Sequence, residues 1–571
     1  MHKSTIEDPG YVTVTTQYGD IRGKNYNISE SHDLNIFLGI PYAQPPVGDL
    51  RLAPPEPVKP WRPDVHHATK HGAKCVQRTI RGDPVLEGVP FSEDCLFLDI
   101  YATREKKSPN EKQSVMLYVH PGGFYGGSGA KYNFTNLALK GVVVVSVSYR
   151  LDLFGFLSTQ DDVIPGNFGL LDVALALDFV KLVISNFGGN PEEITLFGAS
   201  AGAAVVSIFT LSPLTKGKFH KAIMQSGAAL CPWAVFTPGR TVFAPADIAL
   251  DLGRRLNCSL PATGSRANTS RDLLTCLRAT PVDILVGESV AMQEGPYRSN
   301  IIFVPVSGDT LGVLPETPEQ LLAKTAELVA IPTIVGYTTD DGTWLVADSE
   351  NDGVTYTEFT HYVNAYITQF FPPSQRAEIL QRVRAAYLPS NPADLAPAQL
   401  RAILSKITTD LTMAAFIVKQ ARLFSRAGDH VTNGAKPGTF VYQFDYRPSY
   451  STAPLWHGVG HTDEKGFVLG LPPGPDPFSY PNTTLEDRYV AEIVTTMWAD
   501  FAKFGDPTPQ PFNWPEGLRW PRFGHAPHNQ DLLLIDVEPM VKQFDRNQPV
   551  VAWTGSSGIS TPVLSDFSPD S

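Results

Sequence analysis

The sequence predicts an α/β fold in which helices flank a large, mixed but mostly parallel central sheet. The runs 115–120 (VMLYVH) and 142–149 (VVVVSVSY) are apolar on both faces, which is typical of central strands in a sheet covered on both sides. The stretch 170–186 is rich in leucine and alanine and long enough for a mostly buried helix. A strand at 194–197 and a helix at 203–212 follow, and this alternation indicates an α/β core.

The rest of the chain adds elements to this core. Strands are expected around 11–16, at 35–40 and from residue 95, and a later strand at 440–446. Helical periodicity covers 378–387 and 400–426, and an apolar helix resumes at Tyr489 after the proline-rich loop 471–482. No repeat is evident, so we expect one domain over residues 11–545, with loose tails at 1–10 and 555–571.

Composition excludes several classes of partner. Apolar residues make up 43% of the chain and charged residues 18%, which fits a packed globular protein. The net charge of −12 is spread without a basic block, so nucleic acids and anionic membranes are unsuitable partners. No apolar run reaches about 18 residues, so no transmembrane segment is expected.

Cysteines and glycosylation signals favour an oxidising compartment. By proximity Cys75 could pair with Cys95 and Cys258 with Cys276, which leaves Cys231 alone, although a cysteine count does not fix the pairing. We expect a secreted or secretory-pathway protein. The chain begins MHKSTIEDPG, without an apolar signal segment, so a removed leader or a cytoplasmic protein are the alternatives. The N-x-S/T sequons lie at Asn27, Asn133, Asn257, Asn268 and Asn482.

The segment 194–202 (ITLFGASAG) has the pattern of a nucleophile elbow. An apolar strand runs into G-x-S-x-G, where Gly198 and Gly202 keep side chains away from a sharp turn to a helix. The hydroxyl of Ser200 is left at the apex of that turn, and it is the candidate nucleophile. The alternative is a glycine-rich turn that carries an incidental serine.

A serine nucleophile needs donors for the anion that forms on the attacked carbonyl. The segment 120–124 (HPGGF) follows a buried strand and resembles the glycine-rich oxyanion motif of serine hydrolases. Pro121 has no N–H, so the expected donors are the backbone N–H groups of Gly122, Gly123 and Ala201. A tight glycine turn without this role is the alternative.

Taken together, these and other motifs resemble the carboxylesterase/cholinesterase (type-B carboxylesterase) family of α/β-hydrolases. The resemblance runs from about Tyr11 to about Phe544. It implies an α/β-hydrolase fold with loop and helical insertions that form an active-site gorge. It also implies hydrolysis of a small-molecule ester by a serine, acid, histidine triad, without a cofactor. The matching stretches are FLGIPYAQPPVGDLRL, SEDCLFLDIY, VVVVSVSYRLDLFGFLS, GNFGLLD, FGGNPEEITLFGASAG, IMQSGA and MWADFAKFGDPTP.

The resemblance assigns the two partners of the serine. The family's acid follows a strand in a short loop usually written D-E-G, and TTDDG after IPTIVGY places Asp341 there, with Asp340 as the alternative. The family's histidine lies six residues before an F-V-x-G run, which identifies His461 ahead of FVLG, with His457 as its rival. If neither aspartate is the acid, Asp309 and Glu464 are the next candidates. Ser226, in the QSG run, is expected to support the histidine without touching the substrate.

A metal site is the competing interpretation of the histidine segment. His457, His461, Asp463 and Glu464 are close in sequence, and histidines four apart on a helix can bind zinc. Two glycines and a preceding proline make this segment a poor helix, and no H-E-x-x-H is present, so we expect no metal.

Departures from the family pattern bear on the substrate. The residue before the nucleophile is commonly acidic in the family but is Ala199 here, and Val85 stands where cholinesterases carry a tryptophan. Without that aromatic face and that acid, we expect neutral, rather apolar esters in place of choline esters. The resemblance implies disulfides Cys75–Cys95 and Cys258–Cys276; the family's third disulfide is missing, since no cysteine follows Cys276, and Cys231 should be free.

Two other functions are open from sequence. Some relatives lack the serine and act as adhesion proteins, and the set Ser200, Asp341 and His461 argues against that role. A lyase or cyclase that reuses the same pocket is the second alternative. The sequence does not indicate an oligomeric state.

Overall fold

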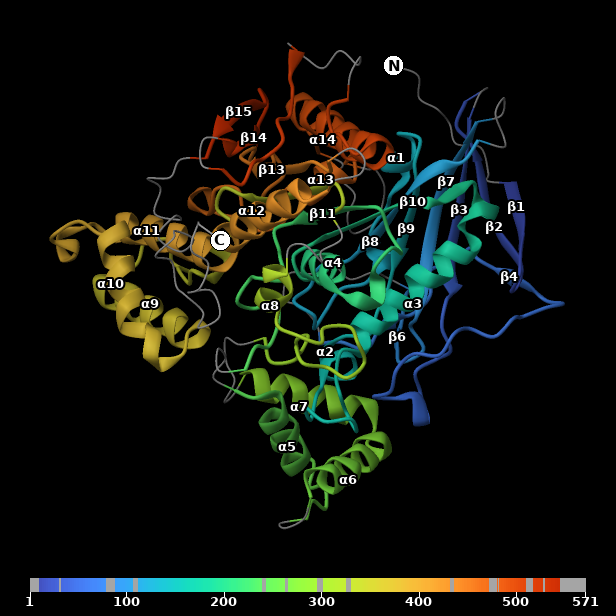
Figure 1. Cartoon of the computed structure of the whole chain (residues 1–571), viewed down its shortest axis with the longest axis horizontal. Helices are drawn as coiled ribbons and strands as arrows, with labels where there is room; N and C mark the ends of the chain where they lie inside the picture. The colour runs from blue at the N-terminus through green and yellow to red at the C-terminus, as the bar shows by residue number, and fades with distance from the viewer. Residues whose placement is uncertain are drawn as a thin grey trace.

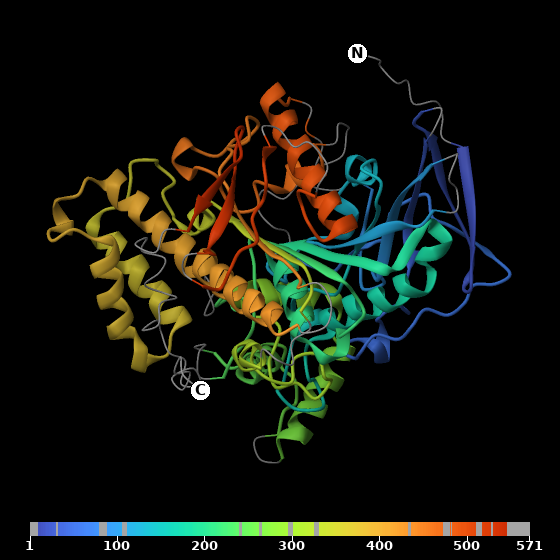
Figure 2. The ribbon, with the colours of Figure 1, turned by 45° about the horizontal axis from the view of Figure 1, so that its top comes forward.

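The structure is a computed structural model, and Figures 1 and 2 show its arrangement. It describes residues 10–29, 32–78, 88–105, 111–238, 243–261, 265–294, 301–324, 330–431, 436–471, 480, 482–509, 517–526 and 529–544. Residues 1–9 and 545–571 lie outside the described part; they hold the expected tails except for Gly10, which is the first residue of the first strand.

One large sheet runs through the molecule. Seven neighbouring strands, from β9 to β14 in the order below, are parallel to one another, while the strands at both ends of the sheet pair antiparallel. This confirms the expected mixed, mostly parallel sheet. The strand order is β1 (Gly10–Thr16), β2 (Gly19–Asn27), β3 (His32–Pro41), β7 (Phe97–Glu105), β9 (Val143–Val147), β8 (Gln113–Val119), β10 (Gly189–Ala199), β11 (Lys221–Gln225), β12 (Thr333–Thr338), β13 (Thr439–Phe444), β14 (Asp531–Ile535) and β15 (Met540–Gln543).

Three short strands lie beside this order. β4 (Val65–His67) pairs with β2 in parallel. β5 (Lys74–Cys75) and β6 (Phe91–Ser92) form a separate two-stranded ribbon.

Helices cover both faces of the sheet, as the two-sided apolar strands require. On one face lie α1 (Thr135–Ala138), α13 (Lys465–Val468) and α14 (Leu485–Phe504), which share a core with the side chains of β8 and β13. On the other face lie α2 (Asp152–Phe156), α3 (Phe168–Val183), α4 (Ala201–Leu211) and α12 (Ala415–Asp429), within a larger core. The sheet therefore separates two hydrophobic cores. Figures 1 and 2 show the helices on its two faces.

Further helices extend away from this sandwich. α5 (Pro245–Arg255), α6 (Arg266–Ala279) and α7 (Val282–Glu294) form one group, seen at the bottom of Figure 1. α9 (Tyr356–Phe370), α10 (Pro373–Tyr387) and α11 (Pro397–Thr409) form another at its left, and α8 (Pro318–Ala323) contacts α4 near the centre. Among the described residues, no helix has the length and apolar character needed to cross a membrane.

Two helical segments differ from their expected form. The segment 400–426 is helical throughout, as expected, but it is not uniformly α-helical: a π-helical turn at Asp410–Ala414 lies between α11, which ends at Thr409, and α12. The buried Asp410 carboxylate accepts hydrogen bonds from Tyr387 and Lys406 at this turn. α14 begins at Leu485, ahead of Tyr489, because Thr484 and Asp487 form a capping box.

The parallel strands bring distant segments to one edge of the sheet. The loop 120–127 follows β8, Ser200 follows β10, and the loop 339–342 follows β12. His461 lies in the connection between β13 and α13. Since β8, β10, β12 and β13 run in the same direction, their carboxyl ends meet where open α/β sheets bind ligands.

Candidate active site

Ser200 lies at the turn between β10 and α4. Its backbone has φ 54° and ψ −123°, a conformation that costs energy for a residue with a side chain. Its N–H donates to Gln225 O at 2.8 Å, and its carbonyl accepts from Ala204 N at 3.0 Å. These bonds hold the turn to β11 and to the first turn of α4.

The glycines of the elbow allow α4 to approach β8. A Cβ added at Gly202 would lie 2.0 Å from Val119 O, and one at Gly198 would lie 2.6 Å from Gly202 C. Both close neighbours are backbone atoms, which do not move aside as a flexible side chain can. The G-x-S-x-G pattern is thus required by packing as well as by the turn.

His461 links Ser200 to Asp341. Its Nε2 lies 2.8 Å from Ser200 Oγ, and its Nδ1 lies 2.5 Å from Asp341 Oδ1. Asp341 is fully buried, and its other carboxylate oxygen accepts from Thr338 N at 3.0 Å. The aspartate side chain therefore reaches the imidazole, and a backbone donor fixes its orientation.

Asp340, the alternative acid, points to a different partner. Its Oδ2 accepts from Val459 N and its N–H donates to Val459 O, each at 3.0 Å. Asp340 therefore ties the acid loop to the segment that carries His461, without touching the imidazole.

The other candidates for the acid and the base lie apart from the serine–histidine contact. Asp309 accepts from the N–H groups of Val313 and Leu314 and from Asn167, which organises a loop. His457 ends a short 3-10 turn and packs its ring on Trp456 at 4.1 Å between centroids. Asp463 accepts from Gly460 N at 2.8 Å. Within the described ranges, no group of three or more metal-ligating side chains gathers.

Glu464 forms a buried polar cluster behind His461. Its Oε1 lies within 3.3–3.5 Å of Tyr442 OH, Gln225 Nε2 and Ser226 Oγ, and no partner for Oε2 occurs in the described residues. Burial, reinforced by the nearby Asp341 charge, raises the pKa of Glu464 to about 7. The sequence suggested Glu464 as a substitute acid or as a member of the alternative metal site, and Ser226 only as a supporting residue. Their contact joins segments that are 238 residues apart, so no local pattern indicates it.

The glycine-rich loop after β8 is folded tightly on itself. Gly122 and Gly123 have φ values of 128° and 59°, and Gly122 O accepts from the N–H groups of Tyr125 and Gly126. His120 is fully buried, burial lowers its pKa to about 3, and its Nδ1 lies 2.9 Å from Pro121 O. The imidazole is therefore neutral and donates to that carbonyl. Ala201 is the first residue of α4, where backbone N–H groups lack an acceptor within the helix.

Two disulfides join the expected pairs, Cys75–Cys95 and Cys258–Cys276, and the buried Cys231 belongs to neither of them. Ala199 is fully buried, whereas Val85 lies outside the described residues. The sequon asparagines 27, 257, 268 and 482 are exposed, and Asn133 is partly buried.

Trp344 is a site residue that the sequence analysis missed. Its indole is about half exposed and lies 6.0 Å from the His461 ring between centroids. It lies two residues after TTDDG, so an aromatic residue close to the acid loop was the available signal.

Comparison with known proteins identifies the family. The model of the carboxylesterase family matches residues 11–553. The chain belongs to the carboxylesterase family. It is also 31% identical over 524 residues to Carboxylesterase 1D of Rattus norvegicus, an alignment that covers 88% of this chain and 87% of the relative. This carboxylesterase is accordingly a carboxylic ester hydrolase with the α/β-hydrolase fold.

Proposed function

We propose that this carboxylesterase hydrolyses esters through an acyl-enzyme on Ser200. The observation that carries the proposal is the continuous hydrogen-bonded series from Ser200 Oγ through His461 to the buried Asp341. His461 Nε2 takes the hydroxyl proton as Oγ attacks the ester carbonyl, and it then delivers that proton to the departing alcohol. A water molecule, deprotonated by the same nitrogen, releases the acid and restores the serine.

The charge that develops on the carbonyl oxygen needs fixed donors. The N–H groups of Gly122 and Gly123 lie in the tight loop after β8, and Ala201 begins α4, next to the nucleophile. We assign these three groups to the oxyanion hole. In comparable sites, loss of one such donor costs about 10² to 10³ in kcat.

Turnover of a short p-nitrophenyl ester tests this function. We expect wild-type enzyme to release p-nitrophenol with a burst, and Ser200→Ala to lose nearly all of this activity while keeping its thermal unfolding profile. Equal turnover in the variant would refute the role of Ser200. The products should be free acid and free alcohol, since a rearranged product would indicate the lyase or cyclase alternative.

We further propose that the preferred substrates are neutral, rather apolar esters. Ala199 supplies no carboxylate beside the nucleophile, and the half-exposed indole of Trp344 offers apolar surface next to His461. An exposed cation–π contact with that indole would contribute only about 0.5–1 kcal/mol to binding a choline ester.

A pair of matched substrates tests this preference. Butyrylcholine and its uncharged isostere 3,3-dimethylbutyl butyrate have nearly the same shape, and we expect kcat/KM to be at least about tenfold higher for the neutral ester. Equal values would mean that Trp344 or another group replaces the missing cation site.

We also propose that the protein passes through the secretory pathway. Two disulfides and four exposed sequon asparagines support this location. Enzymatic removal of N-glycans from protein made in its native host should lower its apparent mass. An unchanged mass would favour the cytoplasmic alternative.

A further inference from the structure

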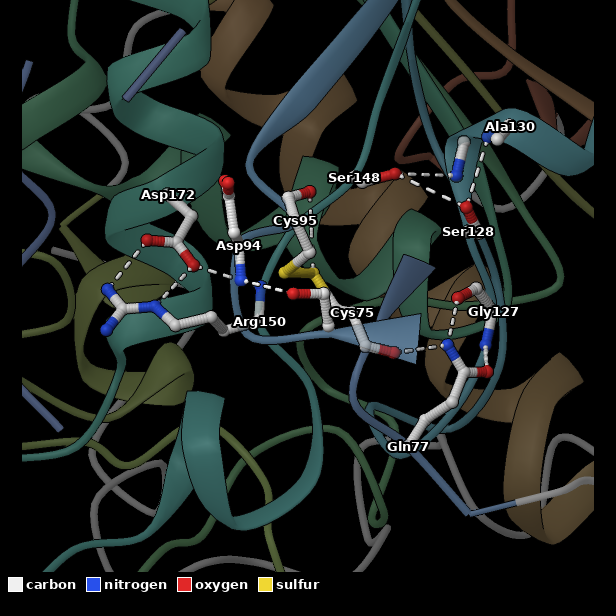
Figure 3. The surroundings of a disulfide bond; sticks show 12 residues. Cys75, Gln77, Asp94, Cys95, Gly127, Ser128, Ala130, Ser148, Arg150 and Asp172 are labelled. Carbon is white, nitrogen blue, oxygen red and sulfur yellow. Dashed lines mark hydrogen bonds and ion pairs between the residues drawn. A yellow bond between two sulfur atoms is a disulfide. The ribbon is translucent and has the colours of Figure 1, made fainter. Parts of the chain in front are cut away.

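The glycine-rich loop 121–127 after β8, which we call the oxyanion loop, is contacted by a side chain from another segment. Gln77 is 8% exposed and lies two residues after Cys75. Its Nε2 donates to Gly127 O at 2.7 Å and to Cys75 O at 2.9 Å, and its Oε1 accepts from Gly127 N at 2.8 Å (Figure 3). Both amide hydrogens are therefore used, and a flipped amide would set its oxygen against two carbonyls.

Through Gly127, this contact acts on the rest of the oxyanion loop. A Cβ added at Gly127 would lie 2.3 Å from Pro121 O, and one added at Gly122 would lie 2.0 Å from Gly126 O. The two ends of the loop 121–127 are thus in direct backbone contact. Fixing Gly127 therefore fixes the place of Gly122, whose N–H is a proposed oxyanion donor.

The backbone segment that carries Gln77 is attached to the central sheet. Cys75 is bonded to Cys95, two residues before β7. On the far side of Gly127, Ser148 at the end of β9 accepts from Gly129 N and contacts Ser128 Oγ (Figure 3). The disulfide thus prevents the segment that carries Gln77 from moving away from the sheet on which the loop rests.

We infer that Gln77 is a positioning residue for the oxyanion hole, held in place by the Cys75–Cys95 disulfide. It does not touch the substrate; it clamps both backbone polar groups of Gly127 so that the N–H groups of Gly122 and Gly123 keep their positions. This inference rests on the proposed acyl-enzyme function. Its expected signature is a loss of transition-state stabilisation at nearly unchanged ground-state binding.

Gln77→Met tests the clamp because methionine has a similar volume but makes none of the three hydrogen bonds. We expect kcat for a p-nitrophenyl ester to fall about 10- to 100-fold, less than or similar to the loss of a direct donor, with KM within about threefold of wild type. The Ki of a trifluoromethyl ketone, whose adduct with serine carries the oxyanion, should rise by the same factor as kcat/KM falls. Gln77→Glu keeps the shape and one acceptor but loses both donors, and we expect at least an equal loss.

Gln530→Ala is the matched control for loss of a buried glutamine. Gln530 is 2% exposed, donates to His525 O and accepts from Arg422, and it directly precedes β14, at the amino ends of the parallel strands. We expect it to lower the unfolding temperature without changing kcat or the ketone Ki. Folded Gln77 variants with wild-type kcat and Ki would overturn the inference. Gln530→Ala would also overturn it if kcat and ketone affinity fell as much as in the Gln77 variants. A wild-type protein that neither turns over the ester nor binds the ketone would instead refute the proposed function.

Discussion

At the scale of single residues, the contact with Asp341 sets the orientation of the His461 ring. Its carboxylate lies 2.5 Å from Nδ1 and is itself held by Thr338 N. In Asp341→Asn the amide can donate to Nδ1 and favour the wrong tautomer, which costs about 10⁴ in turnover in a serine protease. We expect kcat to fall by at least about 10³ with the fold intact.

Asp340→Asn is the matched control for this substitution. An asparagine oxygen can still accept from Val459 N, so we expect kcat within about tenfold of wild type. If Asp340→Asn were the more damaging of the two changes, the assignment of the acid would be wrong.

The raised pKa of Glu464 predicts that the stability of the fold depends on pH. Its folded pKa, raised to about 7, exceeds the ordinary value of 4.5, so the protonated side chain is favoured in the folded state. Its contribution is fully present below about pH 4.5 and is lost as pH rises through about 7. Glu464→Gln removes this titration, so the free energy of unfolding of the variant should gain on that of wild type by on the order of 2–3 kcal/mol between pH 4.5 and 8. Urea unfolding at several pH values measures this gain. If the free energies of unfolding of variant and wild type differed by the same amount at every pH, the raised pKa of Glu464 would be contradicted.

At this scale the sequence predicted best where a residue lies in or beside a short local pattern. Ser200, His461 and Asp341 each do so, and the structure brings the three side chains together. Gln77 was not predicted because its contact with Gly127 joins distant segments, and Trp344 was missed although it lies close to the acid loop in sequence. A buried glutamine two residues after a cysteine has no local signature of a contact with Gly127, 50 residues further on.

At the scale of secondary-structure elements, the close approach of α4 to β8 sets the elbow. We predict that Gly202→Ala lowers the free energy of unfolding by about 3 kcal/mol or more, because its Cβ would overlap the backbone at Val119. Gly287→Ala in α7 is the control, since the added Cβ meets no described atom within 4 Å apart from its chain neighbours and the backbone of its own helix. There we expect a gain of about 0.5–1 kcal/mol from helix propensity. Similar unfolding midpoints for the two variants would show that α4 can shift freely.

Elements with long apolar runs were the ones that the sequence predicted well. The strands around β8 and β9 and the helix α3 are buried on most faces, so their apolar runs are long and unambiguous. The π-helical turn between α11 and α12 was not predicted, because Tyr387 and Lys406 contact the buried Asp410 at that turn. The segments on both sides of the turn are α-helical, so their apolar pattern indicates a helix without placing the turn.

At the scale of the whole molecule, the cysteines give a prediction that covers the complete chain. Cys75–Cys95 and Cys258–Cys276 are bonded and Cys231 is buried, so native protein should resist alkylation. Mass spectrometry should count one alkylated thiol after unfolding without reductant, and all five cysteines after reduction. Three or more alkylated thiols before reduction would contradict the two disulfides.

The central claim is that Ser200 is the nucleophile, and covalent labelling tests it most directly. The account predicts that a stoichiometric organophosphate abolishes ester turnover, adds one phosphoryl group per chain, and modifies Ser200 in the peptide containing ITLFGASAG. His461→Ala should slow this labelling by at least about 10³ while leaving the serine in place, because the hydroxyl then lacks its base. Inhibition with the label on another residue, or full turnover with Ser200 modified, would contradict the account.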